Sequence, residues 1–331
     1  MIIHAKAYPR AGLIGNPSDG YFGKTISFTF SNFAAEVVLY QTPELEIMPA
    51  ERDHSRFRSI QQLAKDVRLH GYYGGLRLLK ATIKSFCSYC EEQQIPLDDR
   101  NFTIRYQSTI PAQVGLAGSS AIITAGFRAL MAFYQVAIPP PILANLILAV
   151  ETKELGIPAG LQDRVAQVYQ GLVYMDFSKA LLDRQGYGHY EPLDPALLPP
   201  LYIAYRTDLA EGTEVFHNNI RARWQSGDPE VHAAMTFWAG LAEQVRELLL
   251  RGAKDRIGPL LDASFERRRQ IYQLSQGNLR MVEAARAVGA SAKFPGSGGA
   301  IVGTYADAAM FAALQDRLEP LGIKVLKPDI V

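Results

Sequence analysis

Residues 111–134 read PAQVGLAGSSAIITAGFRALMAFY, a glycine-rich turn that leads directly into an apolar helix. Because glycine has no Cβ, the backbone of such a turn can approach an anion closely. The first turn of the helix adds unpaired N–H groups and about half a positive charge. The hydroxyls of Ser119 and Ser120 could bind phosphate oxygens or Mg²⁺. The stretch therefore predicts a phosphate site, and the alternative is a small-residue turn used only for packing. No lysine follows the glycines, so this is not a P-loop.

Strands and one long helix are predicted before this turn. The strands are expected at residues 2–8, 25–33, 34–40 and 101–107. A helix is expected over residues 61–94, where apolar residues recur every three or four positions. After the turn we expect helices over 141–155 and from residue 161 onward, and then a strand at 171–177.

Glycine and proline are frequent at residues 183–200, which predicts a loop between two domains. The elements expected beyond it are a strand at 201–205, three helices ending near residue 288, a glycine turn at 295–299, a strand at 300–303, a helix at 306–318 and a strand at 323–326. Both halves mix helices and strands, and 331 residues suffice for two domains. The sequence therefore predicts an α+β fold with domains over residues 1–190 and 191–331.

The overall composition restricts the class of partner. The formal net charge is +1, with 34 basic and 33 acidic residues, and there is no basic tail. A nucleic-acid-binding protein would need a concentrated basic face, so we expect no nucleic-acid partner. The longest apolar run, residues 138–150, is too short to span a bilayer, and no secretory signal is visible. We therefore expect a soluble cytoplasmic protein with no membrane partner.

Cys87 and Cys90 form the only cysteine pair, in the run SFCSYC. A CxxC motif can indicate a redox or metal site. However, a zinc site needs about four ligands, no second CxxC occurs, and the run lies in a part-apolar helical stretch. We interpret the two as reduced cysteines in or near a core, which suits a reducing cytoplasm.

A pair of carboxylates follows the apolar helix, in the segment ETKELGIPAGLQDRVAQVYQG at residues 151–171. Mg²⁺ prefers one or two carboxylates together with substrate phosphates, and transfer to a hydroxyl needs a group that accepts its proton. The Gly-Ile-Pro-Ala-Gly turn could bring Glu151 and Asp163 towards one cleft. The alternative is two exposed carboxylates near helix termini, where acidic residues are common.

A third segment, RAGLIGNPSDGYFGK at residues 10–24, contains a glycine-rich polar loop. Asn16, Ser18 and Asp19 offer an amide, a hydroxyl and a carboxylate, which can pair with sugar hydroxyls as donors or acceptors. The alternative is an Asn-Pro-Ser-Asp turn that only caps itself.

Taken together, these segments resemble the GHMP kinases. The central family signature, PxxxGLxxSSA, is matched by Pro111, Gly115, Leu116, Ser119, Ser120 and Ala121. The late glycine turn of the family resembles KFPGSGGA at residues 293–300, where Pro295 replaces a frequent threonine. Within the superfamily, the segments from about residue 10 to residue 303 are similar to plant-type glucuronokinases.

The resemblance implies a role for each matched residue. Asp163 would be the catalytic base, and Arg10 would orient it and stabilise the charge in transfer. Asn16 and Asp19 would bind sugar hydroxyls, while Ser119 and Glu151 would bind the metal. The ATP-binding residues would be Gly115, Leu116, Ala117, Gly118, Ser119, Ser120, Gly296 and Gly298, with Gly299 helping to shape the cleft floor.

The implied fold is the GHMP kinase two-domain fold, with a ribosomal protein S5 domain 2-like N-terminal domain, a ferredoxin-like C-terminal domain and the active site between them. The implied reaction converts ATP and D-glucuronate to ADP and glucuronate 1-phosphate, with Mg²⁺, in a monomer or homodimer. The alternatives are a GHMP kinase for a different sugar or a mevalonate-type acid, and a non-catalytic nucleotide or sugar sensor.

A uronic acid carries a carboxylate, so a cation should meet it. Lys24, Arg164 and Arg221 are candidates, and each could instead be a surface charge. The polar run at residues 217–219, followed by Arg221 and Arg223, could line a cleft or form a solvated helix face.

Overall fold

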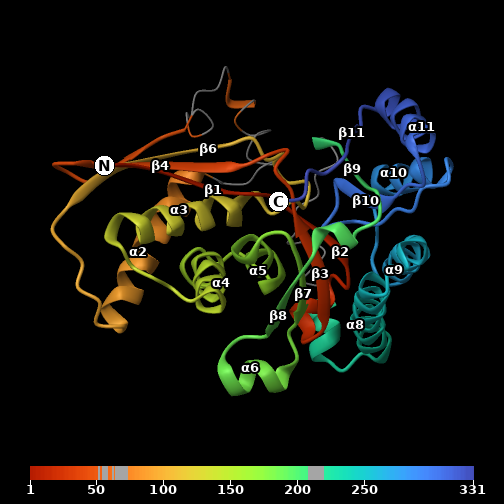
Figure 1. The fold of residues 1–331 in the computed structure, drawn as a ribbon, viewed down its shortest axis with the longest axis horizontal. Helices are drawn as coiled ribbons and strands as arrows, with labels where there is room; N and C mark the ends of the chain where they lie inside the picture. Colours follow the sequence, from red (N-terminus) through yellow and green to blue (C-terminus); the bar gives the residue numbers. More distant parts are fainter. Residues whose placement is uncertain (51–52, 54–58, 62, 64–73, 208–219) are drawn as a thin grey trace. The chain divides into compact units, whose positions relative to one another are not determined.

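The computed structural model describes residues 1–50, 53, 59–61, 63, 74–207 and 220–331 (Figure 1). The chain forms two compact units, each built from several segments. The first unit comprises Met1–Pro9, Phe33–Ile110 and Ala117–Val168. The second unit comprises Arg10–Asn32, Pro111–Leu116 and Tyr169–Val331. The predicted domain limits at residues 190 and 191 stay a prediction.

The first unit is a mixed sheet with helices packed on it. Its strand order is β1 (Ile2–Ala7), β4 (Ala35–Thr42), β6 (Asn101–Ser108) and β5 (Glu46–Met48). β4 is antiparallel to both β1 and β6, whereas β5 runs parallel to β6. Helix α3 (Gly118–Tyr134) packs on β1 and β4, and α2 (Gly75–Glu92) packs on α3, as Figure 1 shows. The apolar length of α3 is therefore explained by burial against the sheet.

Aromatic side chains fill the core between this sheet and its helices. Phe86, Phe102, Phe127 and Phe133 are all fully buried. The rings of Phe102 from β6 and Phe133 from α3 meet edge to face, with 5.4 Å between their centroids. Such pairs add about 0.5–1.5 kcal/mol beyond their area burial, so they fix α3 firmly on the sheet.

The second unit contains two sheets. The first is fully antiparallel, in the order β2 (Arg10–Ile14), β3 (Lys24–Thr29), β7 (Leu172–Asp176) and β8 (His189–Leu193). Helix α8 (Pro229–Leu250) packs on β2 and β3. It buries Trp238 completely, and the Trp238 Nε1 donates to the Ser264 carbonyl at 3.1 Å.

The second sheet of this unit has β9 (Leu201–Tyr205) between β10 (Ala300–Thr304) and β11 (Lys324–Leu326), both antiparallel to it. Three helices contact its strands, namely α9 (Ile257–Ile271), α10 (Gln276–Arg286) and α11 (Ala308–Leu318). The glycine turn at residues 295–299 leads directly into β10.

The predicted mixture of α and β is confirmed, and several local expectations were incomplete or wrong. The segment 183–200 was expected to be a loop, yet it contains the end of α6 (Lys179–Gln185) and strand β8. β8 tolerates Pro192 because it is the edge strand of its sheet. Its Tyr190 ring packs on the Tyr169 ring, with centroids 5.6 Å apart.

The other differences concern the limits of two helices and one strand that was missed. The helix expected over 141–155 is α4 (Pro140–Ala149) followed by a π-helical turn, Val150–Glu154. Strand β2 was not predicted, although all five of its residues are buried. Of the helix expected over 61–94, the structure contains α2, while residues 62 and 64–73 lie outside the described residues.

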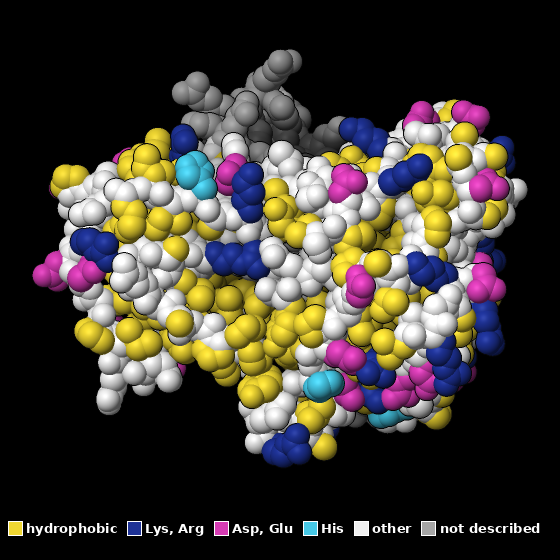
Figure 2. Space-filling model, in the orientation of Figure 1, with side chains coloured by type: hydrophobic (Ala, Val, Ile, Leu, Met, Phe, Trp, Pro, Cys, Tyr) yellow, Lys and Arg dark blue, Asp and Glu magenta, His cyan; other side chains and the backbone are white. Residues whose placement is uncertain are grey.

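Cys87 and Cys90 are both free thiols on α2, and Cys90 is buried. Burial raises the pKa of both thiols above the usual range, so neither has the lowered pKa of a reactive cysteine. In the described part of the chain, no helix is long and apolar enough to cross a bilayer. On the face shown in Figure 2, acidic and basic side chains are interspersed rather than gathered by sign.

Candidate active site

The start of α3 is held in place by a glutamine from a neighbouring helix. Ala117 precedes the helix in a left-handed conformation, with φ of 61°, and Gly118 is the first helical residue. Gln167, on α5 (Leu161–Tyr169), donates through Nε2 to the Ala117 carbonyl at 2.8 Å and to the Tyr8 carbonyl at 3.1 Å. The first turn of α3 contains no acidic residue, so its positive end is free of a competing carboxylate from its own turn.

Ser119, Glu151, Arg164 and Asp163 form one connected polar cluster in the first unit. The Ser119 Oγ donates to Glu151 Oε1 at 2.8 Å. Arg164 donates to Glu151 Oε2 from both Nε, at 2.7 Å, and Nη2. Arg164 Nη1 lies 3.3 Å from Asp163 Oδ2. The structure thus brings three of the sequence-predicted residues together, with Arg164 as the link.

A π-helical turn places the Glu151 side chain. In the turn Val150–Glu154, the amide of Leu155 donates to the Val150 carbonyl at 3.2 Å, which is an i to i+5 bond. Such a turn widens the helix and changes the direction of its side chains, and it is frequent at functional sites. Gly156, with φ of 67°, then ends the turn. As a result Glu151 is only 1% exposed and faces the first residues of α5.

The oxygen atoms of this cluster fit a magnesium ion. Mg²⁺ binds oxygens at about 2.0–2.1 Å in an octahedron, so two neighbouring ligands lie about 2.9 Å apart. The 2.8 Å between Ser119 Oγ and Glu151 Oε1 matches this spacing. The described residues hold no group of three or more His, Cys, Asp or Glu side chains placed to bind a metal. An ion here would therefore take its remaining ligands from phosphate oxygens and water.

In the second unit, Arg10 connects the two glycine turns. Its Nη1 donates to the carbonyls of Gly115, at 2.9 Å, and Pro295, at 2.8 Å. The turns approach so closely that a Cβ on Gly296 would lie 2.3 Å from the Gly115 carbonyl oxygen. Gly115 also has φ of 70°, which favours glycine. Arg268 donates to the Gly296 carbonyl at 3.0 Å and supports the late turn from α9.

Further contacts fix the end of the late turn and the chain beside the early one. Gly298 and Gly299 have φ of 152° and 76°, and the Gly299 amide donates to Asn278 Oδ1 at 2.9 Å. The Leu116 carbonyl accepts from the Arg10 amide at 3.2 Å. Gly115, Leu116, Gly296 and Gly298 thus lie together in the second unit, whereas Ala117, Gly118, Ser119 and Ser120 belong to the first.

The loop carrying Asn16 and Asp19 is held by a buried lysine. Lys293 is only 2% exposed, and its Nζ donates to Asn16 Oδ1 at 2.6 Å and to the Gly12 carbonyl at 2.7 Å. Asn16 Nδ2 donates to the Phe294 carbonyl at 3.3 Å. Both polar atoms of this amide are therefore engaged within the second unit, and a sugar hydroxyl would have to share or replace one of these bonds. Asp19 is partly exposed, in the short turn Ser18–Tyr21.

Two pKa shifts follow from burial near this loop. Burial is the main cause that lowers the pKa of Lys293 well below its usual value, and the nearby cations Arg268 and Arg10 add to it. Burial raises the pKa of Tyr21 to about 12, with opposing effects from Arg221 and Asp19. Tyr21 thus stays protonated at neutral pH and can act as a hydrogen-bond donor.

Two interpretations from sequence were wrong in this region. Arg164 is not a surface charge, since its side chain is only 5% exposed and pairs with Glu151. Glu151 is likewise not an exposed carboxylate. Of the other candidate cations, Lys24 pairs with Glu243 and lies 3.5 Å from Asp176, and Arg221 is exposed. Residues 217–219 lie outside the described residues.

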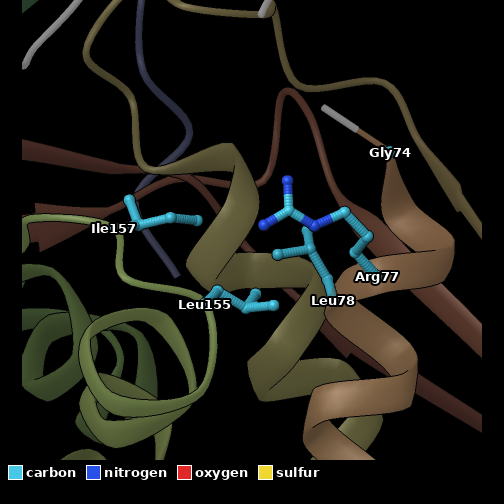
Figure 3. Close-up of a pocket in the computed structure, with 5 residues that line it drawn as sticks. All are labelled: Gly74, Arg77, Leu78, Leu155 and Ile157. Carbon is cyan, nitrogen blue, oxygen red and sulfur yellow. The ribbon is translucent and has the colours of Figure 1, made fainter. Parts of the chain in front are cut away.

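Sequence reasoning missed Lys293 and Gln167. Gln167 could have been found, because it lies four positions after Asp163 and so shares its face of α5. No local signal distinguishes Lys293 from a surface lysine. A shallow depression in the first unit, shown in Figure 3, is lined by Gly74, Arg77 and Leu78 and by Leu155 and Ile157. It contains none of the predicted site residues.

Comparison with known proteins identifies the family. Residues 77–171 match the model of the GHMP kinases N terminal domain. The chain is 45% identical to glucuronokinase 1 of Arabidopsis thaliana over 306 residues, which cover 91% of this chain and 84% of the relative. The chain belongs to the glucuronokinase family. The family resemblance expected from the motifs is therefore confirmed.

Solved structures confirm the fold. The galactokinase of Lactococcus lactis, complexed with galactose, matches with a TM-score of 0.76 and 15% identity, over 99% of this chain and 93% of that chain. The Streptococcus pneumoniae phosphomevalonate kinase matches with a TM-score of 0.75 and 16% identity, over 100% of both chains. This glucuronokinase family member thus has the GHMP kinase fold, as predicted.

Proposed function

We propose that this chain is an ATP-dependent sugar-1-kinase that phosphorylates the anomeric hydroxyl of D-glucuronate to glucuronate 1-phosphate. Membership of the glucuronokinase family supports the substrate class. The observation that carries the proposal is the polar cluster of Ser119, Glu151, Arg164 and Asp163. It combines a hydroxyl and a carboxylate suited to a metal with a second carboxylate suited to a proton, which are the groups that phosphoryl transfer requires.

Each residue of the cluster has a chemical task. Asp163 accepts the proton of the anomeric hydroxyl while that oxygen forms its bond to the γ-phosphorus and the bond to ADP breaks. The start of α3 holds phosphate oxygens with its N–H groups and its positive end. Ser119 and Glu151 would hold Mg²⁺, which when bound neutralises charge on the phosphate oxygens. Catalysis on this view is mainly alignment and charge stabilisation.

The second unit supplies the remaining groups. Arg10 stabilises the charge of the transferring group, and its bonds to the Gly115 and Pro295 carbonyls fix its position. Gly115, Leu116, Gly296 and Gly298 are the ATP-binding residues of this unit, and residues 117–120 are those of the first unit. Asp19 binds sugar hydroxyls, and Asn16 positions the loop that carries Asp19, in addition to any direct contact with the sugar.

The expected setting is the cytoplasm, with the protein a monomer or homodimer. Two free thiols without a disulfide suit a reducing compartment. ATP, Mg²⁺ and a sugar acid are the proposed small-molecule partners.

A substrate panel tests the proposal. Purified protein is incubated with ATP, Mg²⁺ and one acceptor at a time, with glucuronate, galacturonate, galactose, fucose and mevalonate compared by ADP release. Phosphorus NMR of the product identifies the phosphorylated hydroxyl. We expect the highest kcat/KM with glucuronate and a 1-phosphate product. Preference for another acceptor would favour a different GHMP kinase, and nucleotide binding without ADP release from any acceptor would favour a sensor.

A further inference from the structure

Every nitrogen of the Arg164 guanidinium contacts an oxygen of Glu151, Gly160 or Asp163. Nε and Nη2 donate to Glu151 Oε2, while Nη1 donates to the Gly160 carbonyl at 2.9 Å and lies 3.3 Å from Asp163 Oδ2. The three partners come from the π-helical turn, the connecting turn and α5. One side chain therefore fixes the position of Glu151 relative to Asp163.

The ion pair is deeply buried. The Arg164 and Glu151 side chains are 5% and 1% exposed. Replacing a buried ion pair with apolar residues is often neutral or even stabilising, so stability alone is a weak explanation for such a pair. A role in positioning and charge compensation explains why both charges are present.

The geometry of the pair leaves one oxygen of Glu151 available. Both donated bonds from Arg164 go to Oε2, so Oε1 faces only the Ser119 hydroxyl among the bonds of the described residues. Oε1 and the Ser119 Oγ can therefore accept a metal ion without breaking the Arg164 pair. Because Arg164 already neutralises Glu151, a free divalent cation is attracted weakly, and the ion needs the phosphates of a nucleotide as additional ligands.

We propose that Arg164 is a positioning residue that compensates the charge of Glu151, so that the metal binds only together with nucleotide, and that holds Asp163 in register with the metal ligands. This inference rests on the proposed function of the cluster.

Two substitutions of Arg164 distinguish the effect of its forked geometry from the effect of its charge. Arg164→Lys keeps the charge but cannot form the forked contacts, so kcat should fall by about 10–100-fold, with little change in the binding of free metal. Arg164→Met removes the charge, so free Mn²⁺ should bind about tenfold tighter or more without nucleotide, as measured by electron paramagnetic resonance. A residue that served only for folding would not tighten metal binding.

Arg128→Lys is the matched control. Arg128 also lies in the first unit, and its guanidinium donates to the carbonyls of Lys6, Gln167 and Val168 rather than to a metal ligand. We expect this variant to lower the melting temperature while its Mn²⁺ affinity stays unchanged. Circular dichroism checks that every variant is folded.

The possible results are distinct. A kcat for Arg164→Lys within about twofold of wild type, or a loss shared equally by Arg128→Lys, would overturn the positioning role. Unchanged free Mn²⁺ affinity in Arg164→Met would overturn the charge compensation. If the wild-type protein phosphorylates no acceptor while Arg164→Met still binds Mn²⁺ more tightly, the proposed kinase function fails and the inference about Glu151 stands.

Discussion

Lys293→Met tests how a buried amine is accommodated in the second unit. The substitution keeps the length of the side chain but removes the donor to Asn16 Oδ1 and the Gly12 carbonyl. Leaving a buried acceptor without a partner costs about 1–3 kcal/mol. In the opposite direction, the variant no longer has to transfer an amine from water to a site with only 2% exposure.

The pH dependence of the stability difference between wild type and Lys293→Met shows how the burial of the amine contributes. Burial lowers the pKa of Lys293 in the folded protein, whereas the unfolded chain has the ordinary value of about 10.4. Between these two values, the unfolded state binds one more proton than the folded state, so the contribution of Lys293 to stability increases as pH rises. The difference in unfolding free energy, wild type minus Lys293→Met, should increase by about 1.4 kcal/mol per pH unit in this window. It should be constant below the folded pKa and above about 10.4.

Denaturant unfolding from pH 7 to pH 10, followed by tryptophan fluorescence, measures this difference. Both tryptophans of the chain, Trp224 and Trp238, lie in the second unit and report on its unfolding. Lys179→Met is the matched control, because it also replaces a lysine of the second unit and the Lys179 side chain is 64% exposed. A difference that stays flat or decreases with rising pH for Lys293→Met would refute the reasoning, because Lys293 would then be charged in the folded protein.

Three further substitutions test the site. Asp163→Asn should abolish turnover with a modest effect on ATP binding, and a retained rate above about a hundredth of wild type, measured by ADP release, would remove Asp163 as the base. Ser119→Ala should raise the Mg²⁺ concentration for half-maximal activity by about tenfold, and an unchanged Mg²⁺ titration would exclude Ser119 as a ligand. Gly296→Ala should lower the melting temperature and activity, because its Cβ would lie 2.3 Å from the Gly115 carbonyl. Gly240→Ala on α8 is the control, because a Cβ there meets nothing within 4 Å and should stabilise the protein by about 0.5–1 kcal/mol. Equal melting temperatures for Gly296→Ala and Gly240→Ala would contradict the expected difference.

The parts of the fold that depend on local signals could be predicted from the sequence. The glycine turn before α3 was readable because small residues and a following apolar periodicity are adjacent in the chain. β8 was not readable, because glycine and proline dominate its local sequence while its stability comes from pairing with β7. β2 was missed for a similar reason, since a short run that is buried on every residue lacks the alternation of a half-exposed strand.

The candidate site likewise depends on contacts between residues that are distant in the sequence. The motif residues Ser119, Glu151 and Asp163 could be selected by their chemistry and by the family resemblance. The partner of Glu151 could not, because Arg164 is 13 residues away and reaches it only through a π-helical turn, which has no reliable sequence signal. Lys293 contacts Asn16 across 277 residues, so no window of the sequence contains both.

Glu151 and Lys293 show why burial of a charged residue has to be interpreted through its partners. Glu151 has an arginine on one oxygen, so its charge is paired inside the fold. Among the described residues, Lys293 has only a carbonyl and an amide oxygen as acceptors, and burial together with the nearby cations Arg268 and Arg10 lowers its pKa. The Lys293 amine holds the Asn16 loop through these two bonds, while burial and the nearby cations disfavour a positive charge at this position. Two buried ionisable side chains of similar exposure thus have different electrostatic surroundings, and only their contacts distinguish them.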